Sequence, residues 1–184
     1  MSGDAPTRRV AEVLVGRYRI VSGWRGGRAQ AAAFCGQRRV AASEGETLEA
    51  AVAEIETLLA RNAAAFVAHR RATGRPCAAE YREVLEDLPE ALSGPAMLLL
   101  HAHRHMGGMA VKIGDLARRA GLPKEEAWAV YRRLGRRLYS ELKWPPVKRA
   151  AGPRYVLEAF ADCSPGPDGE LVIGLKPEIA EALS

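Results

Sequence analysis

The sequence contains few cysteines and no long apolar run, and both absences narrow the class of protein. Its 184 residues include three cysteines, which are odd in number and far apart. No two of them have metal-ligand spacing, so we expect small buried thiols rather than disulfides. No apolar stretch approaches the roughly 20 residues that span a bilayer, and the first ten residues lack a signal-peptide core. We therefore expect a cytoplasmic protein with no membrane partner.

The motifs of common enzyme classes are also missing. There is no Walker loop, residues 23–27 predict a turn rather than a phosphate cradle, and no serine lies in a nucleophile elbow. On the helix predicted for the segment with His101, His103 and His105, only the first and last would share a face. No HExxH, CxxC or carboxylate pair completes a zinc site. We expect no enzyme, no metal and no cofactor, with a zinc enzyme built on the three histidines as the minor alternative.

Lysine is absent from the first 92 residues, and charge is distributed unevenly along the chain. Residues 1–92 hold 13 Arg against 12 acidic residues, whereas residues 104–154 hold 13 Lys or Arg against 4 acidic residues, a local charge of +9. Residues 155–184 hold 1 Lys against 6 acidic residues, a local charge of −5. A basic block beside neutral and acidic ones indicates a polyanion partner for one face.

The first half of the chain predicts a small antiparallel sheet followed by helices. Residues 17–22 alternate like a strand, and glycines at 23–27 predict a hairpin turn. Further strands are expected at 28–34 and 38–43, after a loose lead-in over residues 1–16. Thr47 is a suitable N-cap for a long helix over 48–71, and a shorter helix is expected at 78–88.

The second half predicts three helices and a hairpin, so the fold class is α+β. Helices are expected at 95–105, 113–120 and 123–142, strands at 155–162 and 170–175, and a last short helix at 177–183. Proline, serine and glycine cluster near residues 89–95, which predicts a linker. The predicted organisation is a domain at 1–88 for interaction or dimerisation, a linker at 89–93, and a second domain at 94–184.

Residues 111–137 form the most specific pattern in the chain: a helix, a tight turn and a second helix with a row of arginines. Ala117 supplies the small residue that two crossing helices need, and Gly121 supplies a turn with positive φ. Apolar side chains that would seat the second helix on a core recur on one face: Val130, Leu134, Leu138 and Leu142.

With Leu116, Ala120, Leu122, Ala127 and Tyr131, these residues make the segment 94–184 resemble a winged helix-turn-helix DNA-binding domain. The order of three helices and a hairpin fits that family. One departure is Ala127, where a larger β-branched residue is more usual.

This resemblance implies double-stranded DNA as the partner, with the start of the second helix in the major groove. The side chains implied nearest the base edges are Lys124, Trp128 and Arg132. Phosphate contacts are implied for the other basic side chains along the motif and ahead of the wing: Arg118, Arg119, Arg133, Arg136, Arg137, Lys148, Arg149 and Arg154. A solvated basic face is the alternative interpretation.

Two features weigh against DNA contact. Glu125 and Glu126 suit the helix dipole but repel phosphates. The expected wing tip carries Asp168 and no basic residue. Trp128 suits a DNA groove or a protein interface, and partial burial against its own domain is an equal alternative.

The strands and the GETLEAAVAEIETLL helix of the first half resemble the β-β-β-α fold of HicB-type antitoxins, which bind a toxin or dimerise. The sequence therefore predicts a DNA-binding protein of the transcriptional-regulator type that acts as a dimer or with a protein partner through residues 1–88. The alternative is a protein-interaction adaptor, such as an antitoxin or an accessory subunit of a nuclease or defence system.

Overall fold

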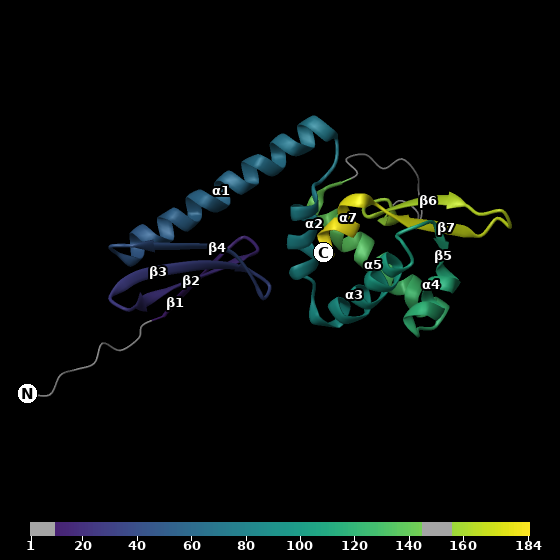
Figure 1. Cartoon of the computed structure of the whole chain (residues 1–184), viewed down its shortest axis with the longest axis horizontal. Helices are drawn as coiled ribbons and strands as arrows, with labels where there is room; N and C mark the ends of the chain where they lie inside the picture. The colour runs from purple at the N-terminus through teal and green to yellow at the C-terminus, as the bar shows by residue number, and fades with distance from the viewer. Residues whose placement is uncertain (1–9, 145–155) are drawn as a thin grey trace, which may run out of the picture. The chain divides into compact units, whose positions relative to one another are not determined.

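The computed structural model describes residues 10–144 and 156–184. The protein is mixed α+β, with a four-stranded antiparallel sheet followed by helices and a small second sheet (Figure 1). It divides into two compact units, Met1–Ala68 (unit 1) and His69–Ser184 (unit 2). The division lies within helix α1 (Leu48–Thr73) and not at the linker expected at residues 89–93.

Unit 1 is a β-meander followed by the start of α1. Strands are connected in chain order, with two-residue loops closing each hairpin. They are β1 (Ala11–Val15), β2 (Tyr18–Arg25), β3 (Arg28–Cys35) and β4 (Arg38–Gly45). The expected three-stranded sheet is therefore wrong by one strand, because residues 11–15 pair with β2 instead of forming a loose lead-in.

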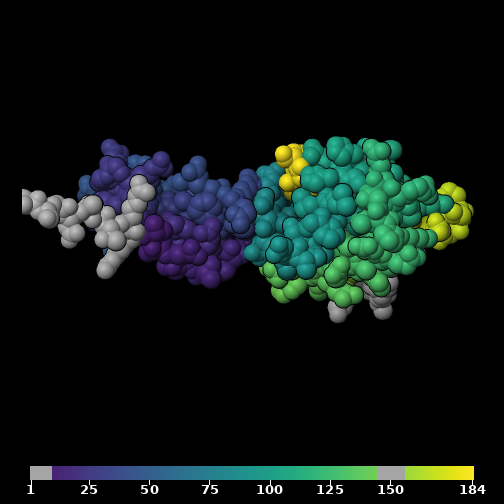
Figure 2. Space-filling view, turned by 90° about the horizontal axis from the view of Figure 1, so that it is seen from below, coloured from purple at the N-terminus to yellow at the C-terminus, as the bar shows by residue number. Residues whose placement is uncertain are grey.

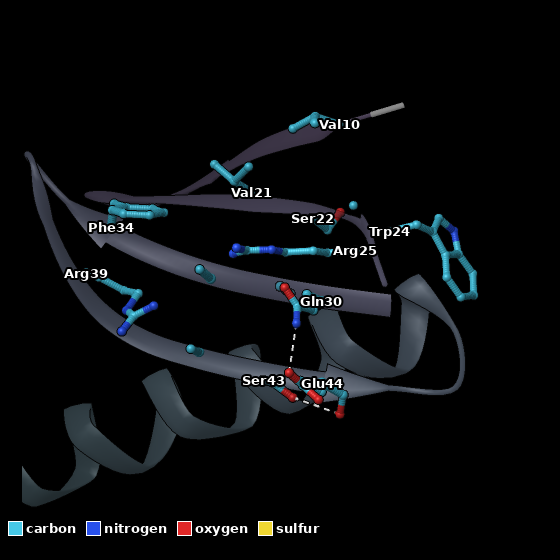
Figure 3. A pocket seen from close by; sticks show the side chains of 14 residues that line it. Val10, Val21, Ser22, Trp24, Arg25, Gln30, Phe34, Arg39, Ser43 and Glu44 are labelled. Carbon is cyan, nitrogen blue, oxygen red and sulfur yellow. Dashed lines mark hydrogen bonds between the residues drawn. The ribbon is translucent and has the colours of Figure 1, made fainter. Parts of the chain in front are cut away.

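Small side chains allow α1 to pack closely on one face of this sheet. Ile20, Ala31 and Ala33 are buried there against Ala51 and Ile55 of the helix. The predicted N-cap is confirmed, since the Ala50 amide donates to the Thr47 hydroxyl at 3.1 Å. The opposite face of the sheet bears a shallow hollow lined by residues of β2, β3 and β4 (Figure 3).

Unit 2 packs its helices and its three-stranded sheet around one apolar core. Strand β7 lies between β5 and β6, and all pairs are antiparallel. The elements are α2 (Ala78–Glu86), α3 (Glu90–His105), β5 (Val111–Lys112), α4 (Ile113–Ala120), α5 (Lys124–Leu142), β6 (Ala161–Pro165), β7 (Leu171–Leu175) and α7 (Pro177–Ala182).

Two expectations for unit 2 need correction. Residues 90–93 of the expected linker are the start of α3, because Leu92 and Ala96 are buried and their packing outweighs the weak helix propensity of the intervening Ser, Gly and Pro. The strand expected at 155–162 begins only at Ala161, since residues 156–160 form a helical turn whose side chains enter the core.

Candidate nucleic-acid interface

The turn between α4 and α5 has the geometry that the sequence predicted. Gly121 adopts a left-handed conformation with φ of 69°, which ends α4. The Leu122 amide then donates to the Ala117 carbonyl at 2.9 Å and closes the turn. Ala117 itself is buried where the two helices pack. The turn therefore fixes the direction in which α5 leaves α4.

Helix α5 has one buried stripe and one outward face. The stripe comprises Ala127, Val130, Tyr131, Leu134, Gly135, Leu138 and Leu142. At 100° per residue, Arg132, Arg133 and Arg136 project from the opposite side. Arg133 and Arg136 are exposed, and neither has a hydrogen-bond or ion-pair partner among the described residues. These three arginines are named the α5 arginine face below.

Trp128 is partly buried against the core of unit 2. The guanidinium carbon of Arg132 lies 5.8 Å from the centre of its indole ring, within cation–π range. The Arg132 Nε is buried and has no hydrogen-bond partner among the described residues. Trp128 thus positions the guanidinium of Arg132 at one edge of the α5 arginine face, a role that the sequence left open.

The turn of the β6–β7 hairpin takes part in an ion-pair cluster that the sequence did not predict. Lys112 Nζ contacts Asp168 and lies 3.8 Å from a Glu170 oxygen, and Lys124 Nζ lies 3.2 Å from the other Glu170 oxygen. The hydrogen bond between Lys112 and Asp168 raises the pKa of the lysine and lowers the pKa of the carboxyl group. We call these four residues the wing cluster.

The wing cluster is neutral overall, with two cations and two carboxylates. It ties the hairpin to β5 and to the first residue of α5, while the hairpin projects from the body of unit 2 in both Figure 1 and Figure 2. Lys124, expected near the bases, is therefore already paired. One feature of the sequence could have indicated these ion pairs: an acidic C-terminal segment follows the basic block, and opposite charges attract.

The other expected contacts divide into three groups. Arg137 pairs with Asp87 at 3.1 Å and with Glu141 at 3.0 Å, so its side chain serves packing between α5 and α2. Arg118 pairs with Asp115 at 3.0 Å yet remains 79% exposed, and Arg119 is exposed. Three further expected residues, Lys148, Arg149 and Arg154, lie outside the described residues.

A close contact holds the segment after α5 against the buried side of that helix. A Cβ added at Gly135 would lie 2.3 Å from the Val156 carbonyl oxygen, which is far inside van der Waals contact. Nearby, the Tyr81 hydroxyl donates to the Ala159 carbonyl at 2.7 Å. Burial raises the pKa of Tyr81, so its hydroxyl stays protonated as a donor. These contacts fix the position of residues 156–160, which lead into the β6–β7 hairpin.

His103 is the one buried histidine among the described residues, and its ring is hydrogen-bonded inside unit 2. Its Nε2 lies 3.0 Å from the Met109 carbonyl, which can only accept, so this nitrogen carries the proton. The Tyr131 hydroxyl lies 3.1 Å from the other ring nitrogen, Nδ1, and 3.4 Å from the Leu99 carbonyl, both of which can accept its proton. Burial lowers the pKa of His103, which favours this neutral form. His101 and His105 are exposed, and no cluster of metal-ligating side chains occurs in the described parts of the chain.

The sheet face of unit 1 opposite α1 forms a second, shallow surface feature. Figure 3 shows Arg25 and Arg39 beside a hollow that the small residues Gly23, Ala32 and Ala42 also line. Gln30 donates to Glu44 at 2.7 Å on the same face. The hollow brings no predicted site residue together.

Comparison of the chain with protein-family models, with curated proteins and with solved structures found no match. Within residues 10–144 and 156–184, no helix combines the length and apolar character needed to cross a membrane.

Proposed function

We propose that unit 2 binds double-stranded DNA through the α5 arginine face, as the winged helix-turn-helix domain of a transcriptional regulator. The observation that carries this proposal is the row of Arg132, Arg133 and Arg136 opposite the buried stripe of α5. Guanidinium groups on an exposed helix suit phosphate oxygens and the guanine edge.

The architecture supports the same proposal. A short helix, a left-handed glycine turn and a longer helix precede a projecting hairpin, which is the order that the winged family has. Strand β5 adds a third strand beside β7 and joins the hairpin to α4. The α5 arginine face therefore sits on a braced scaffold, which DNA recognition by a helix requires.

The wing cluster limits which part of unit 2 would contact DNA. Because Asp168 and Glu170 neutralise Lys112 and Lys124, the hairpin turn offers no net positive charge to a phosphate. We therefore assign DNA contact to the middle of α5 rather than to its first turn or to the wing. Arg132 would contact a base edge, and Arg133 and Arg136 would contact phosphates.

The neutral wing and the exposed pair Glu125 and Glu126 favour a second candidate, an adaptor whose unit 2 binds protein. A protein partner would pair with the acidic as well as the basic side chains of unit 2, whereas DNA would contact the arginines alone. Removing arginines of the α5 arginine face should therefore weaken duplex binding specifically only if unit 2 binds DNA through them.

Fluorescence anisotropy with mixed-sequence duplex DNA tests the proposal. Wild type should bind at low salt, and Arg133→Ala/Arg136→Ala should bind more weakly, because two phosphate partners are lost. The matched control is Arg61→Ala/Arg71→Ala, which removes the same charge from two exposed arginines of α1. No duplex binding by wild type, or equal weakening in both variants, would favour the adaptor candidate.

A further inference from the structure

Strand β1 is an open edge of the unit 1 sheet. It pairs with β2 on one side, and no strand among the described residues pairs with its other side. All five of its residues, AEVLV, are exposed. An edge strand leaves a row of backbone donors and acceptors available to another strand.

The apolar core of unit 1 stops at β2, although apolar side chains continue onto β1. Val13 lies opposite Ile20, and Val15 lies opposite Tyr18, so both valines are on the face that α1 covers. Ile20 is 2% exposed, whereas Val13 is 54% and Val15 is 38% exposed. The cover that α1 provides therefore ends between β2 and β1, and none of the residues that the structure describes buries the apolar strip on β1.

The usual protection of an edge strand is missing from β1. Proteins guard such edges with lysine, proline or an inward-pointing charge. The one charged residue of β1 is Glu12, and Arg19 of the neighbouring strand pairs with it at 3.3 Å. Leu14, on the other face, is 73% exposed. The edge therefore presents apolar side chains on both faces with no unpaired charge.

We propose that β1 pairs antiparallel with β1 of a second copy of this chain, making one eight-stranded sheet across a two-fold axis. In the register centred on Val13, the two Val13 side chains face each other. Ala11 then faces Val15 of the second copy, and Glu12 faces Leu14 of the second copy. On the face that α1 covers, the small Ala11 side chain lies opposite the larger Val15 side chain of the second copy. No two like charges are directly opposed.

A second copy fits this edge better than an unrelated strand. The second copy supplies the same apolar side chains, alternating between the two faces of the strand in the same way. On the face that α1 covers, Val13 and Val15 of each copy would therefore be covered by apolar side chains of the other. A two-fold pairing of identical patches is also the commonest form of protein oligomer. The pairing rests on unit 1 alone and stands whether or not unit 2 binds DNA.

The dimer would present two copies of unit 2. If each binds DNA as proposed above, the assembly would engage two half-sites, and affinity for a two-site duplex would exceed that for one site. A failure of DNA binding would leave the dimer intact, and a monomeric protein could still bind one site, so the two proposals fail separately.

Sedimentation equilibrium of the full chain tests the pairing. Wild type should be dimeric, and Val13→Lys should weaken dimerisation by roughly tenfold or more, because two lysines would oppose each other at the axis. The control Val67→Lys places the same charge at an exposed valine of α1, 49% exposed, and should remain dimeric. Circular dichroism would verify that both variants are folded.

Mixing variants tests the register itself. Val13→Glu alone should weaken dimerisation as Val13→Lys does, and mixing the two variants should restore dimers, since opposite charges then meet at the axis. A monomeric wild type would overturn the proposal and direct attention to a strand from another protein. Dimerisation of Val13→Lys equal to that of wild type would overturn the assignment to β1.

Discussion

Replacing Gly135 with alanine should destabilise unit 2, whereas the same replacement at Gly114 should stabilise it. At Gly135 the new Cβ would lie 2.3 Å from the Val156 carbonyl oxygen. Ordinary carbon–oxygen contacts are about 3.3–3.6 Å, so the backbone of α5 or of residues 156–160 must move by about 1 Å. A backbone carbonyl cannot rotate away as a flexible side chain can.

The expected size follows from two opposing effects. Overpacking of this kind costs about 3 kcal/mol, and alanine in a helix recovers about 1 kcal/mol relative to glycine. The free energy of unfolding of unit 2 should therefore fall by about 2 kcal/mol. Gly114 lies within α4, and the nearest atoms to an added Cβ there are those of the flexible Lys124 side chain, at an ordinary contact distance of 3.7 Å. There the helix effect acts alone, and the free energy of unfolding should rise by about 1 kcal/mol.

Urea unfolding followed by tryptophan fluorescence measures both effects, since Trp128 and Trp144 are partly buried in unit 2. The two variants should shift the midpoint in opposite directions. Equal stabilisation by both substitutions would refute the close packing of residues 156–160 on α5 and with it the bracing of the hairpin.

Two further predictions concern buried polar groups of unit 2. Tyr81→Phe should lower the free energy of unfolding by about 1–3 kcal/mol, since it leaves the Ala159 carbonyl without its donor; urea unfolding unchanged from wild type would contradict this bond. Burial lowers the pKa of His103 below its usual 6.5, so just below pH 6.5 the unfolded chain binds a proton that the folded chain does not. The free energy of unfolding should therefore fall as the pH drops below about 6.5. His103 should have no effect on stability above that pH. His103→Gln should remove part of this acid sensitivity, and His101→Gln, at an exposed site, should retain it; equal acid sensitivity in wild type and His103→Gln would contradict burial of the neutral ring.

Local signals in the sequence located most helices. The long helix was expected at residues 48–71 and spans Leu48–Thr73, and the helix expected at 113–120 is α4. In each case the pattern combined an apolar stripe with a terminating residue. Gly121 was placed correctly because its positive φ is a local requirement of the turn.

What the sequence did not predict depends on contacts between distant residues. Strand β1 lacks the alternation of a half-buried strand, and its structure is set by pairing with β2. Residues 156–160 look extended in sequence but curl to fill the core beside Gly135. The wing cluster joins residues about 50 positions apart, and no local pattern specifies such a pair.

The salt dependence of duplex binding tests the central claim, DNA contact through the α5 arginine face, most directly. Each phosphate contact contributes about 0.9 to the slope of log affinity against log salt concentration. Arg133→Ala/Arg136→Ala should therefore flatten the slope by about 1.8, and Arg61→Ala/Arg71→Ala should keep the slope of wild type. Identical slopes for the two double variants, or a wild type that does not bind duplex at low salt, would contradict the account.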